Sequence, residues 1–94
     1  MLLQTIHNQK GENIMFSHLI IELAKIGYIR IIGSIVELSV DGRLLVMEDF
    51  YDSLYSLLES LDFSTEPFFS DNLEGDCFKV ESNENNFTLN VIYC

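Results

Sequence analysis

Apolar and polar residues alternate along Ser34–Val40, as they do in a strand that buries one face. The dipeptide Asp41-Gly42 follows directly, and it is typical of a two-residue hairpin turn. The spacing therefore predicts that residues 34–40 form a hairpin with residues 43–47, which places Leu38 opposite Leu45. A slip of one residue would turn the polar side chains of this strand into the core, so the pattern also specifies the register.

The hydrophobic period then changes from two to about 3.6 residues, which is the period of an α-helix. The apolar residues that recur at this spacing are Phe50, Leu54, Leu57, Leu58 and Leu61. They predict an amphipathic helix over Phe50–Leu61 that packs one stripe against a core. Asp52 and Glu59 fall on the opposite, exposed side of this helix.

Weaker patterns lie toward the N-terminus. Leu2–His7 is compatible with a short strand, and Tyr28–Ile32 is rich in β-branched residues and predicts a strand. Gly33 follows, where it could form a bulge that bends one long strand. Ile14–Ile26 fits either a helix or a strand, because a Glu-Leu-Ala-Lys run favours the helix while the Ile20-Ile21 pair favours the strand.

The C-terminal third predicts a second hairpin. Its arms are Cys77–Ser82 and Phe87–Tyr93, joined by a turn at Asn83–Asn86. Between the helix and this hairpin, Asp62–Asp76 contains the only proline, and we expect a long loop there. These elements predict a single α+β domain over residues 1–94, with an antiparallel sheet of four to five strands packed against one or two helices.

The charge of the chain is concentrated in its second half. Residues 1–47 contain four acidic and four basic residues, whereas residues 48–94 contain eleven acidic residues and one lysine, Lys79. The net charge of −10 therefore belongs to residues 48–94. Such a surface disfavours direct binding to nucleic acid or to an anionic membrane, because phosphates are bound by Lys and Arg. It favours a basic protein partner, although acidity of this kind also keeps small domains soluble.

The sequence shows no targeting signal and no apolar run that approaches the length of a membrane span, so we expect a cytoplasmic protein. Two cysteines, Cys77 and Cys94, are too few for a disulfide framework. We expect reduced thiols, and a bridge between the two remains an open alternative.

Catalytic and metal-binding patterns are not evident. His7 and His18 are the only imidazoles, and neither has a motif that pairs it with Cys77 or Cys94 as a nucleophile or as a zinc ligand. The acidic residues near Gly75 do not follow the EF-hand spacing. We therefore expect neither an enzyme nor a cofactor.

The remaining candidate is a protein-binding surface. Aromatic anchors surrounded by charge gain affinity from burial and a faster association from electrostatic steering. The loop after the helix combines both kinds of residue, and the exposed side of the helix adds further acids. The predicted partner-binding residues are Asp52, Glu59, Glu66, Phe68, Phe69, Asp71, Glu74 and Asp76.

Three segments together carry a resemblance to a known group of proteins. They are the Val36–Gly42 segment, the helix at Phe50–Leu61, and the pair Phe78-Lys79-Val80 and Phe87-Thr88-Leu89. In this order the chain resembles the small acidic immunity proteins that bacteria encode beside polymorphic and contact-dependent growth-inhibition toxins. The resemblance implies a cytosolic inhibitor that binds a cognate toxin, commonly a nuclease with a basic substrate groove.

Two other classes of function are compatible with the same sequence. An inhibitor that mimics nucleic acid would place its acids at phosphate-like spacing and bind several DNA- or RNA-binding proteins. A structural subunit would instead form an oligomer through an exposed sheet edge or an apolar helix flank, with its acidity serving solubility.

Overall fold

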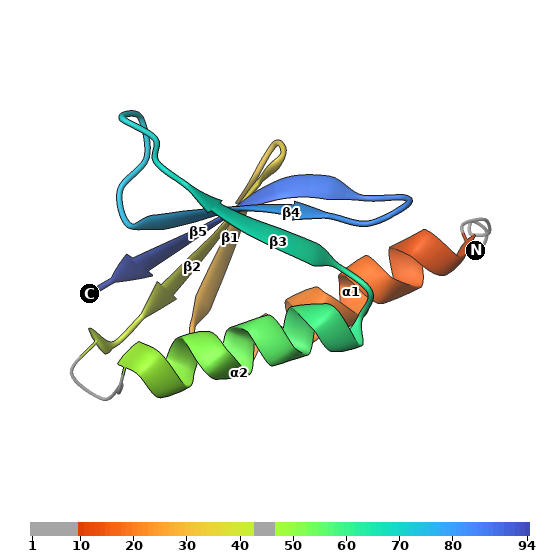
Figure 1. Cartoon of the computed structure of the whole chain (residues 1–94), viewed down its shortest axis with the longest axis horizontal. Helices are drawn as coiled ribbons and strands as arrows, with labels where there is room; N and C mark the ends of the chain where they lie inside the picture. Colours follow the sequence, from red (N-terminus) through yellow and green to blue (C-terminus); the bar gives the residue numbers. More distant parts are fainter. Residues whose placement is uncertain (1–9, 43–46) are drawn as a thin grey trace.

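The computed structural model describes residues 10–42 and 47–94. It contains, in chain order, α1 (Lys10–Ala24), β1 (Tyr28–Ile32), β2 (Ile35–Val40), α2 (Met47–Ser60), β3 (Ser64–Phe68), β4 (Asp76–Glu81) and β5 (Asn86–Tyr93) (Figure 1). The strand considered at Leu2–His7 lies outside the described residues.

The five strands form one sheet in the order β1-β2-β5-β4-β3. Three of the four neighbouring pairs are antiparallel, whereas β2 and β5 run parallel. The α+β class and the number of strands are therefore confirmed, but the sheet is mixed rather than wholly antiparallel. β5, the last strand in the sequence, lies at the centre of the sheet.

The predicted hairpin between residues 34–40 and 43–47 is wrong. Both edges of β2 are already paired, and Leu38 lies between Ile29 of β1 and Val91 of β5. Residues 43–46 of the predicted second arm lie outside the described residues. Met47 begins α2 instead of ending a strand. Asp41-Gly42 is a local turn signal, but β2 pairs instead with β5, which lies far away in the sequence.

The first hairpin in the described part of the chain is instead β1–β2. Ile32 pairs with Ile35, so Gly33 and Ser34 form a two-residue turn. Gly33 has a φ of 59°, a conformation that glycine adopts without steric cost. Gly33 therefore reverses the chain and is not a bulge in one long strand.

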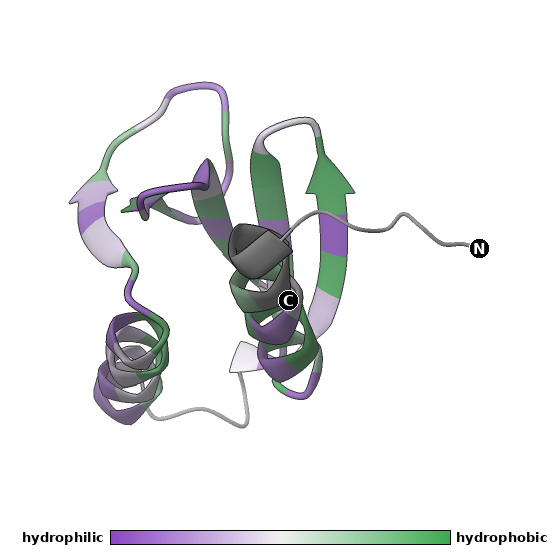
Figure 2. Ribbon diagram, turned by 90° about the vertical axis from the view of Figure 1, so that its right-hand side faces the viewer, coloured by the Kyte–Doolittle hydropathy of each residue, from purple (hydrophilic) through white to green (hydrophobic). Residues whose placement is uncertain are grey.

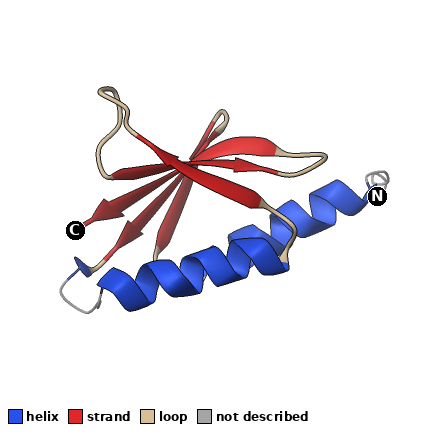
Figure 3. Cartoon of the chain, viewed as in Figure 1, coloured by secondary structure: helices blue, strands red, loops and turns tan. Residues whose placement is uncertain are grey.

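Both helices cover the same face of the sheet (Figures 1 and 3). α1 decides the ambiguity at Ile14–Ile26 in favour of a helix. The predicted stripe of α2 is confirmed, because Phe50, Leu54 and Leu58 are buried. Figure 2 shows the two helices side by side, with the sheet above them.

The core lies between this helical layer and the covered face of the sheet. Its buried apolar residues come from both helices, from the segment after α2, and from β2, β4 and β5. They are Leu19, Leu23, Val36, Leu38, Val40, Phe50, Leu54, Leu58, Leu61, Phe63, Phe78, Val80, Phe87, Leu89 and Val91. Alternation along β2 places Val36, Leu38 and Val40 in this core, as the sequence pattern predicts.

The segment Asp62–Asp76 is not one long loop. Its first part forms the edge strand β3, which pairs with β4 so that Pro67 lies opposite Phe78. An edge strand is the position in a sheet where proline is tolerated. The connection between β3 and β4 is thus residues 69–75, which we call the 69–75 loop. The β4–β5 hairpin is confirmed, with Val80 opposite Phe87.

The other face of the sheet is not covered by either helix. One row of residues crosses all five strands on this face, in the order Arg30, Glu37, Asn90, Cys77 and Phe68. Arg30 and Glu37 form an ion pair with 3.3 Å between Nε and Oε1. Asn90 is only 1% exposed and accepts a long hydrogen bond of 3.7 Å from the Cys77 thiol. The centre of this open face is therefore polar but desolvated.

Candidate partner-binding site

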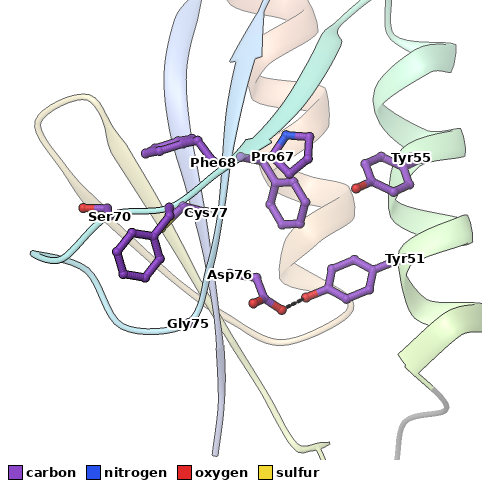
Figure 4. Close-up of a pocket in the computed structure, with 10 residues that line it drawn as sticks. Tyr51, Tyr55, Pro67, Phe68, Ser70, Gly75, Asp76 and Cys77 are labelled. Carbon is purple, nitrogen blue, oxygen red and sulfur yellow. Dashed lines mark hydrogen bonds between the residues drawn. The ribbon is translucent and has the colours of Figure 1, made fainter.

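A pocket of about 290 Å³ lies where the 69–75 loop joins β3 and β4, facing the middle of α2 (Figure 4). It is lined by Tyr51, Tyr55, Pro67, Phe68, Phe69, Ser70, Gly75, Asp76, Cys77 and Phe78. Aromatic side chains thus come from α2 and from the β3–loop–β4 segment that follows it in the sequence. Among these lining residues, Asp76 alone carries a charge at neutral pH.

The helical wall of the pocket is made by Tyr51 and Tyr55. They lie four residues apart on α2 and therefore project from the same side of the helix. Their ring centroids are 6.4 Å apart and their planes differ by 33°. Both rings also contact Phe78 of β4, at centroid distances of 5.6 Å and 5.9 Å. The contacts with Phe78 hold this wall against the sheet.

A chain of hydrogen bonds joins this wall to the carboxylate. The Tyr93 hydroxyl of β5 donates to the Tyr51 oxygen, and the Tyr51 hydroxyl donates to Oδ2 of Asp76. Figure 4 shows the second of these bonds between Tyr51 and Asp76. The Tyr51 hydroxyl thus holds the Asp76 carboxylate through Oδ2.

Burial raises the pKa of Tyr51 far above its ordinary value, and its hydrogen bonds to Asp76 and Tyr93 raise it further. Burial also raises the pKa of Tyr93, although its bond to Tyr51 acts in the opposite direction. Both phenols are therefore protonated at neutral pH and act as hydrogen-bond donors. The negative charge of this network stays on Asp76.

A consequence is a stability that declines in alkali. A tyrosine in the unfolded chain loses its proton near pH 10, whereas Tyr51 in the folded protein keeps it, so stability falls as pH rises above about 10. We expect Tyr51→Phe to lose about 1 kcal/mol at pH 7 through the missing hydrogen bonds, and to show a shallower alkaline decline. Urea unfolding at pH 7 to 11 measures both effects.

Tyr28→Phe is the matched control, because Tyr28 is 70% exposed on β1 and changes its environment little on folding. It should follow the pH dependence of the unsubstituted protein. An alkaline decline in Tyr51→Phe as steep as that of the unsubstituted protein would show that Tyr51 does not contribute to it.

The predicted site residues divide into two groups. Phe68, Phe69 and Asp76 line the pocket, and Asp71 and Glu74 are exposed on the adjoining 69–75 loop. Phe69 is 85% exposed and Phe68 42% exposed, so neither is a core residue. Phe68 pairs with Cys77 on the open face of the sheet, whereas Asp76 points toward the helical face.

The other predicted residues are exposed but do not line the pocket. Asp52 and Glu59 lie on α2, and Glu66 lies on β3 opposite Lys79. Sequence reasoning missed Tyr51 and Tyr55. Their i, i+4 spacing beside the apolar stripe was the available signal.

The two edges of the sheet differ in charge. On the β1 side, ion pairs among the described residues join Lys25 to Glu22 of α1, and Arg30 of β1 to Glu37 of β2. The pocket edge instead carries the exposed acids Asp71, Glu74 and Asp76. The molecule thus has one charge-balanced edge and one acidic, aromatic edge.

Both cysteines are free thiols, so Cys77 and Cys94 are not bridged. Burial, assisted by the nearby charge of Asp76, raises the pKa of Cys77. Within residues 10–42 and 47–94, no group of three or more His, Cys, Asp or Glu is arranged to hold a metal ion. In the same part of the chain, neither helix is long and apolar enough to cross a membrane.

Comparison of the chain with family models, with curated proteins and with solved structures finds no match. The candidate site therefore rests on its own geometry and charge.

Proposed function

We propose that the protein is a cytoplasmic binding protein of the immunity or antitoxin type, which neutralises a basic partner such as a nuclease toxin. It acts by occupying a surface of that partner and not as an enzyme. The observation that carries the proposal is the acidic, aromatic pocket edge, where exposed Phe69 adjoins Asp71, Glu74 and Asp76. Exposed aromatic rings supply buried area on binding, and the carboxylates steer a basic protein toward them.

The first test identifies the partner. The tagged protein is used to retain proteins from its native cells at low and moderate salt, and the retained proteins are identified by mass spectrometry. The proposal expects one stoichiometric basic protein, whose toxic activity is then titrated away by the purified protein. A set of unrelated nucleic-acid-binding proteins would support mimicry of nucleic acid instead.

The second test asks whether the pocket edge makes the contact. Glu74→Lys and Glu84→Lys change the net charge equally, but Glu74 lies in the 69–75 loop and Glu84 in the turn at the other end of β4. At low salt, Glu74→Lys should slow association with the partner several-fold more than Glu84→Lys does. Stopped-flow or biosensor kinetics at two salt concentrations measures the difference. Equal rates for the two variants would place the contact elsewhere.

The charge-balanced edge favours a second candidate, a subunit that forms oligomers. Among the described strands, β1 lies at the edge of the sheet and pairs only with β2, and it is mostly hydrophobic in Figure 2. Tyr28, Ile31 and Ile32 are each about half exposed or more. The unpaired backbone N–H and C=O groups of an exposed hydrophobic edge strand can pair with a strand of another chain. A dimer that persists in high salt, and that Ile31→Lys converts to a monomer in light scattering, would support this candidate.

A further inference from the structure

The pocket at the 69–75 loop combines features that select one kind of chemical group. Its helical wall offers the rings of Tyr51 and Tyr55, with Phe78 behind them. Asp76 supplies the charge, and the sole charge among its lining residues is negative. Aromatic faces beside a carboxylate attract cations, because the ring quadrupole and the carboxylate act in the same direction.

We propose that this pocket binds the guanidinium group of an arginine side chain from the partner protein. The inference rests on the proposed function, since it assigns part of the acidic edge to one residue of a basic partner. The guanidinium stacks on the exposed Tyr55 ring and donates to the carboxylate of Asp76.

Three observations favour guanidinium over a neutral ligand or an ammonium group. Tyr55 is 39% exposed beside the pocket, so one of its surfaces is open to a partner. The Tyr51 and Tyr55 rings are inclined by only 33°, so they form a wall that suits a flat group. Asp76 is fixed by Tyr51 and does not have to be reoriented when a donor arrives. A planar guanidinium can stack and donate at once, whereas an ammonium is a compact point charge.

The negative charge of Asp76 is not neutralised by Lys79 within the pocket lining. Lys79 is the one basic residue of the second half of the chain, and it is not among the pocket-lining residues. It lies instead on the open face, opposite Glu66 in the β3–β4 register. Among residues 10–42 and 47–94, no lysine or arginine lines the pocket that a cation from the partner would have to displace from Asp76.

The test uses small probes and does not require the partner. Acetylated and amidated Gly-Arg-Gly is titrated into the labelled protein, and amide and aromatic signals are followed by NMR. Gly-citrulline-Gly is the matched neutral probe, because citrulline has nearly the shape of arginine without its charge. We expect shifts centred on Tyr51, Tyr55 and Asp76, with arginine binding at least about tenfold more tightly than citrulline.

Two variants test the two halves of the pocket separately. Asp76→Asn removes the charge but retains an oxygen that accepts from Tyr51, and Tyr55→Leu removes the ring but retains an apolar side chain. Each should weaken binding of the arginine probe about fivefold or more. Glu84→Gln removes one charge at the far end of β4 and should leave binding unchanged. Circular dichroism and thermal unfolding establish that each variant is folded.

Equal binding of the arginine and citrulline probes would overturn the inference, as would equal binding of a Gly-Lys-Gly probe or shifts located outside the pocket. An undiminished affinity in both folded variants would do the same. These results would leave the proposed function standing, because it is tested by the partner assays. Conversely, arginine binding in the pocket without any basic partner in cells would overturn the proposed function and leave the pocket assignment standing.

Discussion

Replacing Gly75 by alanine is expected to destabilise the folded protein by about 3 kcal/mol or more, one of the largest effects of any single substitution. Gly75 has a φ of 81°, which costs a residue with a side chain about 1 to 2 kcal/mol. A Cβ atom at this position would also lie 2.0 Å from the carbonyl oxygen of Val91. Because Val91 belongs to the central strand, the clash cannot be relieved by a side-chain rotation. Chemical unfolding measures the loss.

Gly33→Ala is the matched control, because Gly33 also has a positive φ but nothing lies within 4 Å of its added Cβ. It should lose only the conformational term of about 1 kcal/mol. If the two variants were equally stable, the close approach of Gly75 to β5 would not constrain the fold. The 69–75 loop would then be free to move away from the sheet.

Leu58→Ala is expected to cost about 3 kcal/mol, within the range of about 2 to 5 found for buried leucines. Leu58 is fully buried in the stripe of α2 that packs on the sheet. Its truncation leaves a cavity at the interface of the two layers. Domains of this size have a total stability of about 5 to 15 kcal/mol, so a large part would be lost.

Leu57→Ala removes the same atoms from the adjacent residue of α2. Leu57 is only partly buried at the margin of the core, so we expect a loss of about 1 kcal/mol. The two substitutions have the same effect on helix propensity, and their difference reports burial alone. A loss for Leu57→Ala as large as for Leu58→Ala would show that α2 packs with a different face toward the sheet.

Elements whose signal is local could be predicted from the sequence. The stripe of α2 and the β4–β5 hairpin each depend on residues close together in the chain, and both are confirmed. The parallel pairing of β2 with β5 has no turn and no local signature, so it could not be predicted. The prediction from Asp41-Gly42 failed for this reason. β3 was missed because it is a short edge strand that contains Pro67.

The candidate site was only partly predictable. Phe68, Phe69 and Asp76 were predicted from composition and do line the pocket, whereas Tyr51 and Tyr55 come from a distant helix. Their contacts with Phe78 depend on how α2 packs across the sheet. Asp52 and Glu59 were included because they are acidic and exposed, but they do not line the pocket. Charge alone does not reveal which residues surround a pocket.

The central position of β5 has a consequence for synthesis in the cell. The β1–β2 hairpin and the β3–β4 pair meet only through β5, which is the last of the described strands to leave the ribosome. Until then, the edges of β2 and β4 that β5 will occupy have no strand beside them, and such edges are sites of aggregation. The sheet therefore closes in one late step, and a chain that stalls before Asn86 would lack the centre of its sheet rather than its rim.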